Sequence, residues 1–265
     1  MFPHFILFGW TIQAYGLMNA VAFLSGILWL KRHRARMGLN ENAFWAGIWC
    51  LLLGAVAGAK ALFVALAWEY YASGRLHLIT DFRYGFVYFG GLLGAALAGW
   101  AFARRCRLSF VRGADYFAVA VPMGHAIGRL GCLAAGCCHG SVTTLPWAVS
   151  LTDPACLVPA GFRGLPLHPV QLYEAAGLVA VAWACRWSLR KVEAGLCPEG
   201  TAFRLYLVLY GLLRVSMDLF RGDGRPERLL GISFQQGMAL ACLLVAACLS
   251  TSTRETKPGA SAPTT

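Results

Sequence analysis

Charged residues are scarce in this sequence. They occupy 13% of its 265 positions, while apolar residues occupy 58%, whereas a typical soluble domain carries about 25% charged residues. The few charges gather in short stretches between long apolar runs. A soluble enzyme of this size would need more polar surface, so the composition predicts a protein that lies within a lipid bilayer.

The sequence also lacks a basic amphipathic face with interleaved aromatic residues, which is the pattern typical of nucleic-acid binding. Its net charge of +11 comes from 23 lysines and arginines against 12 acidic residues. These basic residues lie in short clusters between apolar runs, where anionic lipid headgroups would neutralise them. We therefore expect the lipid bilayer as a partner and no nucleic acid.

The first residues do not have the pattern expected of a cleaved secretory leader. The chain begins Met1-Phe2-Pro3-His4-Phe5, without a basic region and without a small-residue cleavage site before the long apolar run. We therefore expect the first apolar segment to be retained as a membrane span.

A membrane-spanning helix needs about 20 mostly apolar residues. Seven segments approach or meet this requirement: 6–30, 44–67, 86–103, 114–130, 169–187, 203–220 and 231–249. The sequence therefore predicts an all-α, polytopic integral membrane protein whose seven transmembrane helices form one domain over residues 1–250. The polar stretch 251–265 is predicted to be a disordered cytoplasmic tail.

The distribution of basic residues predicts the orientation, because lysine and arginine concentrate in cytoplasmic loops. In a seven-span arrangement fourteen of them fall on one side: Lys31, Arg32, Arg34, Arg36, Arg104, Arg105, Arg107, Arg112, Arg186, Arg190, Lys191, Arg204, Arg254 and Lys257. Eight fall on the other side: Arg75, Arg83, Arg129, Arg163, Arg214, Arg221, Arg225 and Arg228. The N-terminus is thus predicted outside and the C-terminus inside, and in a bacterium the long loop 131–168 would face the periplasm.

The stretch 124–140 is the leading candidate for a functional site. It leaves the apolar segment 114–127 carrying His125 and Arg129, which share a helix face if the helix continues through Gly128. The glycines that follow are expected to end the helix. An arginine at this depth is unfavourable without an anion or a partner, which makes Arg129 a functional candidate.

Two later helices carry polar faces of their own. The fifth helix begins at His168-Pro169 and places Gln171 and Glu174 on one side. The sixth helix carries Arg214, Asp218 and Arg221 at spacings of four and three. This second set is either part of a site or a self-neutralising ladder of ion pairs that stabilises the bundle.

These segments together resemble the bacterial prolipoprotein diacylglyceryl transferase family. The matching stretches, in chain order, are Tyr15-Gly16-Leu17-Met18, Phe89-Gly90-Gly91-Leu92, Gly128-Arg129-Leu130-Gly131 with Gly140, His168-Pro169-Val170-Gln171-Leu172-Tyr173-Glu174, Tyr210-Gly211-Leu212-Leu213-Arg214 with Asp218 and Arg221, and Ser233 with Gln236. Each stretch is weak by itself, and their order along the chain makes the resemblance specific.

The resemblance implies an enzyme of the bacterial inner membrane whose active site faces the periplasm. It would transfer the diacylglyceryl group of phosphatidylglycerol to the lipobox cysteine of a prolipoprotein signal peptide, forming a thioether and releasing glycerol phosphate. Arginine binds phosphate oxygens in a bidentate fork, so Arg129 and Arg214 are the expected catalytic cations. The other expected substrate-binding residues are Tyr15, Gly140, His168, Gln171, Glu174, Asp218 and Arg221. We expect neither a cofactor nor a metal.

The chain departs from the family pattern at several positions. The family usually carries asparagine, asparagine and glutamate where this chain has Cys132, Ala135 and Cys137, and histidine where it has Phe89. Attack by sulfur on carbon needs a thiolate and therefore a proton acceptor. His139 is the expected base, with His125 as the alternative.

The cysteines of the central loop allow other interpretations. Cys132, Cys137, Cys138 and Cys156, with His139, have the residue types of a zinc site, but four residues separate the first two cysteines and the next two are adjacent, which is unlike usual zinc spacings. A disulfide in an oxidising compartment and simple close packing of small residues both remain open. At the level of function, the alternatives are a transferase with another acceptor and a phospholipid-binding protein without catalysis.

Overall fold

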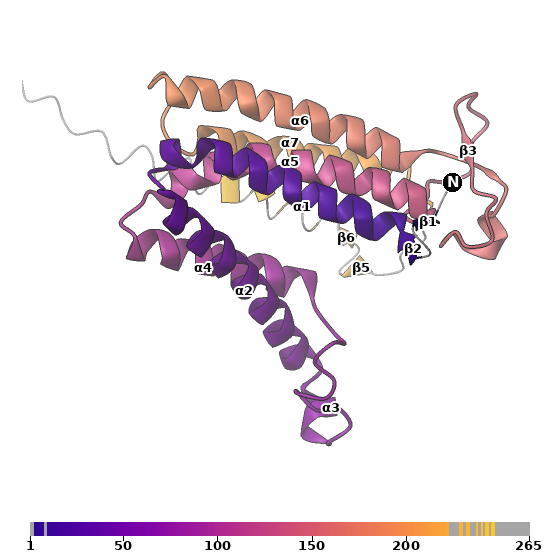
Figure 1. Cartoon of the computed structure of the whole chain (residues 1–265). Helices are drawn as coiled ribbons and strands as arrows, with labels where there is room; N and C mark the ends of the chain where they lie inside the picture. Colours follow the sequence, from indigo (N-terminus) through magenta and orange to yellow (C-terminus); the bar gives the residue numbers. More distant parts are fainter. Residues whose placement is uncertain are drawn as a thin grey trace, which may run out of the picture. The chain divides into compact units, whose positions relative to one another are not determined.

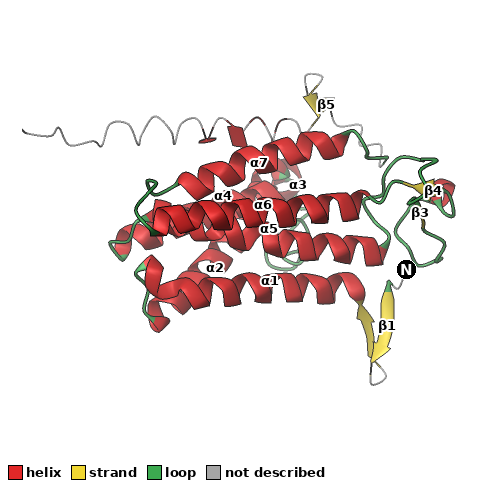
Figure 2. Ribbon diagram, turned by 90° about the horizontal axis from the view of Figure 1, so that it is seen from above, coloured by secondary structure: helices red, strands yellow, loops and turns green. Residues whose placement is uncertain are grey.

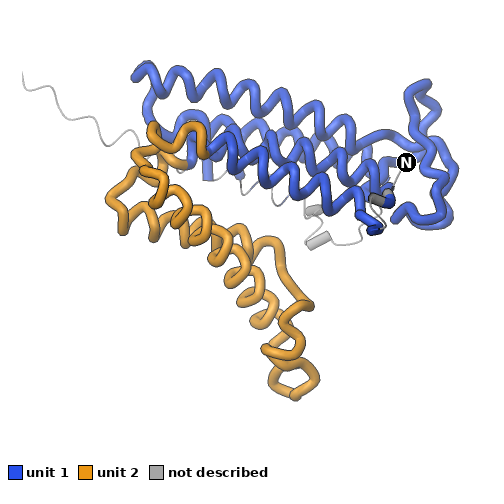
Figure 3. The backbone as a smooth tube through the Cα atoms, viewed as in Figure 1, with its two compact units in different colours: residues 1–30, 114–265 blue, residues 31–113 orange. Residues whose placement is uncertain are grey.

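The computed structural model describes residues 3–7 and 10–222, together with the isolated positions 228–229, 232–233, 237, 240, 242–243 and 245–246. The described chain is mostly helical, with seven α-helices and three short two-stranded sheets (Figure 2). It divides into two compact units (Figure 3): unit 1 comprises Met1–Leu30 and Ala114–Thr265, and unit 2 comprises Lys31–Gly113.

Unit 1 is built on four long helices that run side by side (Figures 1 and 2): α1 (Ala14–His33), α5 (Phe110–Ala135), α6 (Val170–Glu193) and α7 (Thr201–Asp218). Three of them agree with the predicted segments to within a few residues. The first does not, because α1 begins at Ala14 rather than near residue 6.

A β-hairpin occupies the residues before α1. Strand β1 (His4–Leu7) pairs antiparallel with β2 (Trp10–Gln13), and Ala14 N–H donates to the Pro3 carbonyl at 2.9 Å. Phe5, Ile6 and Ile12 are aromatic or β-branched, which favours strands over helix. The apolar composition of this stretch alone did not distinguish the two structures.

Helix α5 is longer than predicted and ends at Ala135, not at the earlier glycines. Those glycines remain helical because α1 packs directly on them: a Cβ added at Gly131 would lie 2.9 Å from the Cβ of Met18. The helix ends at Gly136, whose φ of +67° is the left-handed conformation that glycine adopts without penalty. The thiol-bearing turn therefore begins one helical turn later than expected.

A buried carboxylate connects α5 to the start of α7. Asp115 is fully buried and accepts hydrogen bonds from the backbone N–H groups of Gly200 at 2.6 Å and Phe203 at 2.9 Å. These N–H groups lie at the N-terminus of α7, where no helical carbonyl is available to them. Asp115 thus caps α7 from a different helix.

The predicted loop 131–168 folds around a small core of its own. Strands β3 (Val149–Ser150) and β4 (Pro166–Leu167) pair antiparallel, and a 3-10 turn, η2 (Ala160–Phe162), lies between them. The core consists of Leu151, Cys156, Val158 and Leu167. This packing holds the loop that follows α5 against the start of α6.

Unit 2 contains η1 (Arg34–Met37), α2 (Glu41–Leu66), α3 (Trp68–Ala72) and α4 (Tyr88–Arg105). Helices α2 and α4 approach so closely that a Cβ at Gly58 would collide with the Gly90 carbonyl oxygen. Lys60 is buried within this unit, and its Nζ donates to the carbonyls of Asp81, Phe82 and Tyr84 at 3.3, 3.4 and 2.9 Å. It therefore orders the segment between α3 and α4.

Three helical segments of the described residues are long and apolar enough to cross a membrane: Ala14–Met37, Glu41–Leu66 and Phe110–Ala135. Large apolar side chains on other helices also point outward, including Leu97 on α4 and Trp183 on α6, at 65% and 75% exposure. An apolar surface of this kind belongs in lipid. Most of the predicted span 231–249 lies outside the described residues, and β6 (Ile232–Ser233) occupies its first positions.

Candidate active site

A single carboxylate joins two arginines in the interior of unit 1. Arg129 on α5 donates from Nη2 to Oε1 of Glu174 at 2.7 Å, and Arg214 on α7 donates from Nη1 to the same oxygen at 3.0 Å. Glu174 on α6 is fully buried, and the two arginine side chains are 13% and 8% exposed. Three helices therefore converge on one charged cluster.

The contact between Arg214 and Glu174 adds a second helix to the polar set predicted on the sixth helix. The observed carboxylate partner of Arg214 is Glu174 on α6, so the arginine is not neutralised within its own helix alone. Glu174 also provides a protein partner for Arg129, for which the sequence had left an anion and a partner group both open. Sequence spacing shows which residues share a helix face but not which helices meet.

The cluster keeps an excess of positive charge and unused hydrogen-bond donors. Two guanidinium groups against one carboxylate leave one net positive charge. Within the described residues, Nε of Arg129, Nε of Arg214 and Oε2 of Glu174 are buried without a hydrogen-bond partner. Buried polar groups are normally satisfied, so unpaired N–H donors beside an uncompensated positive charge favour an anionic ligand.

His125 lies at the edge of the same cluster. Its Nε2 is 3.7 Å from Oε1 of Glu174, its ring lies 5.9 Å from that of Tyr210 between centroids, and its side chain is 28% exposed. His125 and Arg129 do share one face of α5, as their spacing indicated. The structure thus brings His125 to the carboxylate that binds both arginines.

Gln171 links this cluster to the loop that follows α5. It lies one turn before Glu174 on α6 and is buried, and its Nε2 donates to the Cys137 carbonyl at 2.7 Å. Helix α6 therefore has the predicted polar face. Its Glu174 belongs to the charged cluster, and its Gln171 binds the turn that carries the cysteines.

Gly140 passes through a crowded point between three segments. A Cβ at this position would lie 2.5 Å from the His168 carbonyl oxygen, and the residue forms an isolated β-bridge with Arg221. Ser141 N–H donates to the Phe220 carbonyl at 2.9 Å and His168 N–H to the Ser141 carbonyl at 2.9 Å. Glycine is therefore needed here, and Gly140 brings His168 and Arg221 together.

His139 is buried beside this crossing. Its Nδ1 is 2.9 Å from the Gly140 carbonyl oxygen and its ring lies 4.7 Å from that of Phe162 between centroids. A carbonyl oxygen only accepts, so Nδ1 carries the hydrogen and Nε2 holds the lone pair. Within the described residues this Nε2 has no hydrogen-bond partner, which leaves it able to take a proton.

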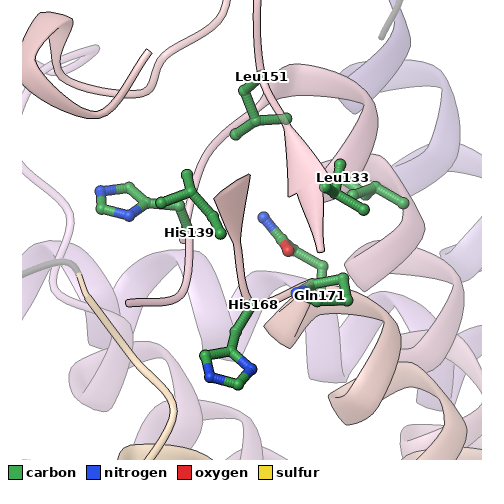
Figure 4. A pocket seen from close by; sticks show the side chains of 8 residues that line it. Leu133, His139, Leu151, His168 and Gln171 are labelled. Atoms are coloured by element: carbon green, nitrogen blue, oxygen red, sulfur yellow. The ribbon is translucent and has the colours of Figure 1, made fainter. Parts of the chain in front are cut away.

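A small cavity lies between the loop and the start of α6 (Figure 4). Its lining includes Leu133, His139, Leu151, His168 and Gln171, and its volume is about 10 Å³. That volume is about one water molecule. The cavity is therefore too small for a lipid headgroup in this structure.

The turn after α5 gathers three cysteines. Cys137 N–H donates to the Cys132 carbonyl and Gly136 N–H to the Leu133 carbonyl, both at 3.1 Å, which is the Schellman pattern of helix termination. This pattern brings the side chains of Cys132 and Cys137 together. Cys138 then adopts φ +55°, and the three sulfur atoms lie within 4.8 Å of one another.

The three thiols affect each other's ionisation. Hydrogen bonds from Cys132 and Cys137, and then the positive charges of Arg129 and Arg221, hold the pKa of Cys138 well below its usual range. Hydrogen bonds with Cys132 and Cys138 raise the pKa of Cys137. Cys138 therefore lies within electrostatic reach of Arg129 in the charged cluster.

Tyr15 and Asp218, which were also expected in the site, lie at the ends of their helices. Tyr15, at the start of α1, is 45% exposed and lies against α5 at Gly131. Asp218 is the last residue of α7, four positions after Arg214. Ser233 lies in β6, and Gln236 falls outside the described residues.

The expected site residues did not include Asn19, and the cysteines of the central loop were interpreted only through the open alternatives of a zinc site, a disulfide or close packing. A Cβ at Gly128 would lie 3.5 Å from Oδ1 of Asn19, which therefore faces α5 one position from Arg129. Asn19 lies four residues after Tyr15 on the same helix face, a spacing that would have indicated it.

The fold and the cluster together define a helical membrane protein with a buried, cationic site shared by three helices. The family model for prolipoprotein diacylglyceryl transferase matches residues 3–252 of this chain. Three relatives called phosphatidylglycerol–prolipoprotein diacylglyceryl transferase are similar over most of their length. The one from Geobacter sulfurreducens is 32% identical over 91% of both chains. The one from Nitratidesulfovibrio vulgaris is 35% identical over 82% of this chain and 78% of its own. The one from Clostridium tetani is 29% identical over 83% and 85%. The chain belongs to the prolipoprotein diacylglyceryl transferase family, so the resemblance seen in its sequence is confirmed.

Proposed function

We propose that this protein transfers the diacylglyceryl group of phosphatidylglycerol to the lipobox cysteine of prolipoprotein signal peptides. The observation that carries this proposal is the pair of arginines on one buried carboxylate, whose two Nε donors have no partner among the described residues. A phospholipid phosphate has the charge and the acceptor oxygens that this arrangement lacks. The names of the similar proteins agree with this substrate pair.

Arg129 and Arg214 are the proposed phosphate clamp. In the reaction, the acceptor sulfur forms a bond to the glyceryl carbon while the bond from that carbon to the phosphate oxygen breaks. Negative charge grows on the departing glycerol phosphate, and positioned guanidinium groups stabilise that charge most strongly in the transition state. Glu174 would position both guanidinium groups, and Gln171 would position the neighbouring turn.

His139 is the proposed base that takes the proton of the acceptor thiol. Its free Nε2 lone pair supports this role, since its Nδ1 hydrogen is held by the Gly140 carbonyl. His125 is the alternative, because it contacts Glu174. Gly140, His168, Arg221, Asp218 and Tyr15 are proposed to shape the substrate-binding surface around them.

The proposed setting is the bacterial inner membrane, with the N-terminus and the loop 131–168 on the periplasmic side. The excess of basic residues in the loops at 31–36, 104–112 and 186–204 supports this orientation. We retain the proposal of a seven-span domain over residues 1–250 followed by a cytoplasmic tail.

Transfer of radiolabel from phosphatidylglycerol to a synthetic lipobox peptide tests this function. We expect the purified full chain to label the peptide with cysteine at the acceptor position and not the matched peptide with serine there. Phospholipid binding without transfer to the cysteine peptide would contradict the enzyme and favour a lipid-binding protein.

A further inference from the structure

The three thiols at the end of α5 are arranged as a metal site requires. Their sulfur atoms all lie within 4.8 Å of one another. Tetrahedral zinc binds thiolate sulfur at about 2.3 Å, which places neighbouring sulfurs about 3.8 Å apart. The observed separations therefore exceed the spacing of zinc-bound sulfurs by no more than about 1 Å.

The backbone of this turn is consistent with a functional arrangement. Helix termination at Gly136 accounts for the approach of Cys132 and Cys137 without any ligand. It does not account for Cys138, which adopts φ +55° although it is not glycine. A non-glycine residue in this conformation is uncommon, and such residues concentrate at functional sites. A disulfide needs two sulfurs, whereas this geometry brings in a third.

The position of the thiols relates them to the arginine cluster. Cys132 follows Arg129 by three residues on α5, so the two share a helix face about 4.5 Å apart along the axis. Gln171 holds the Cys137 carbonyl one turn before Glu174 on α6. A sulfur nucleophile held at the thiols would therefore lie beside a phosphate held by Arg129.

We propose that Cys132, Cys137 and Cys138 form a three-thiolate zinc site whose fourth coordination position receives the acceptor cysteine of the substrate. Zinc sites with three protein ligands and one open position are typical of catalysis, and a thiol that binds zinc is deprotonated. The nearby positive charge of Arg129 offsets the net negative charge of three thiolates around a divalent ion.

This inference deepens the proposed function and rests on it for the identity of the fourth ligand. The acceptor thiol would bind the zinc as a thiolate and release its proton to water. The sulfur lone pair then forms the carbon–sulfur bond. The electron pair of the broken carbon–oxygen bond leaves with glycerol phosphate, and the zinc is unchanged.

Metal analysis of the purified full chain tests the site without any activity measurement. We expect about one zinc per chain, and at least a 100-fold loss of zinc affinity in Cys138→Ser. The matched control is Cys106→Ser, since Cys106 is exposed and lies in unit 2, and it should retain zinc. Absence of zinc in the folded wild-type chain, or a disulfide among the three cysteines, would overturn the proposal.

Cobalt replacement provides a second readout that needs no variant. After removal of zinc, Co²⁺ should give the intense visible bands of tetrahedral thiolate coordination, and a lipobox peptide with cysteine should shift these bands while its serine counterpart should not. No shift with the cysteine peptide would contradict the open position. A wild-type chain that performs transfer without zinc would refute the metal site and leave the proposed function standing. A zinc-loaded chain without transfer would refute the proposed function, and with it the acceptor cysteine as fourth ligand, and would leave only the three-thiolate zinc site.

Discussion

Arg129 and Glu174 form a buried ion pair, with 2.7 Å between Nη2 of the arginine and Oε1 of the carboxylate. The same oxygen also binds Arg214, so one carboxylate is paired with two guanidinium groups. A buried pair stabilises a fold only weakly, because desolvation offsets most of its attraction, but removal of one partner is strongly destabilising. The arrangement therefore makes separate predictions for stability and for turnover.

Arg129→Lys should lower turnover by about 10- to 100-fold, because lysine keeps the charge but loses the planar fork that binds phosphate. A charge-assisted hydrogen bond contributes about 1.5–3 kcal/mol, and about 1.4 kcal/mol corresponds to one decade in rate. Steady-state transfer on detergent-purified protein measures the effect. Arg163→Lys, at an exposed position of the central loop, is the control, and normal turnover in Arg129→Lys would contradict the clamp.

Glu174→Ala should destabilise the fold by about 3–5 kcal/mol, since it leaves two buried guanidinium groups without their carboxylate. Thermal unfolding in detergent measures this change, with the exposed Glu69→Ala as a control. Added inorganic phosphate should restore part of the loss, because an anion then replaces the carboxylate. A fall in melting temperature no larger than that of Glu69→Ala would mean that the charged cluster is more hydrated than its burial indicates.

Asp115→Ala should lower thermal stability without changing turnover per folded molecule. The substitution removes both hydrogen bonds to the start of α7, and loss of a helix cap costs about 0.5–2 kcal/mol. Asp115→Asn keeps one side-chain acceptor and should lose less thermal stability than Asp115→Ala. Equal losses of stability in the two variants would argue against the capping role.

Accessibility from the periplasm should follow the predicted orientation. Leu157→Cys lies in the central loop at a position that is 71% exposed, and a membrane-impermeant maleimide should modify it in intact spheroplasts. Cys106 is exposed in the chain but is predicted to face the cytoplasm, so it should react only after permeabilisation. Mass spectrometry distinguishes the two sites, and the reverse order of labelling would invert the topology.

The sequence predicted the helices α2, α4, α6 and α7 closely, because each is a long apolar segment bounded by charges, proline or glycine. It failed at His4–Gln13, where apolar residues form a hairpin, and at the end of α5, where packing by α1 keeps Gly131 helical. The first failure arose because apolar composition alone does not distinguish a strand from a helix. The second arose because packing between helices overrides the local preference of glycine.

The residues of the charged cluster were predicted individually, but their partners were not. Spacing placed His125 with Arg129 and Gln171 with Glu174, since each pair lies within one helix. The ion pair between Arg214 and Glu174 connects two helices, and residue spacing within one helix cannot predict it. The sequence raised Cys132, Cys137 and Cys138 as one group, but their spacing argued against a shared site. Spacing does not show the left-handed backbone of Cys138, with which the three sulfurs lie close together.

The most direct test of the account is single-turnover transfer from radiolabelled phosphatidylglycerol to a lipobox peptide, measured together with thermal stability for the wild-type chain, Arg129→Ala and Arg214→Ala. We expect transfer by the wild-type chain and a loss of at least about tenfold in each variant per folded molecule, since each loses one charge-assisted bond to the phosphate. Near-normal transfer by either folded variant would contradict the arginine clamp.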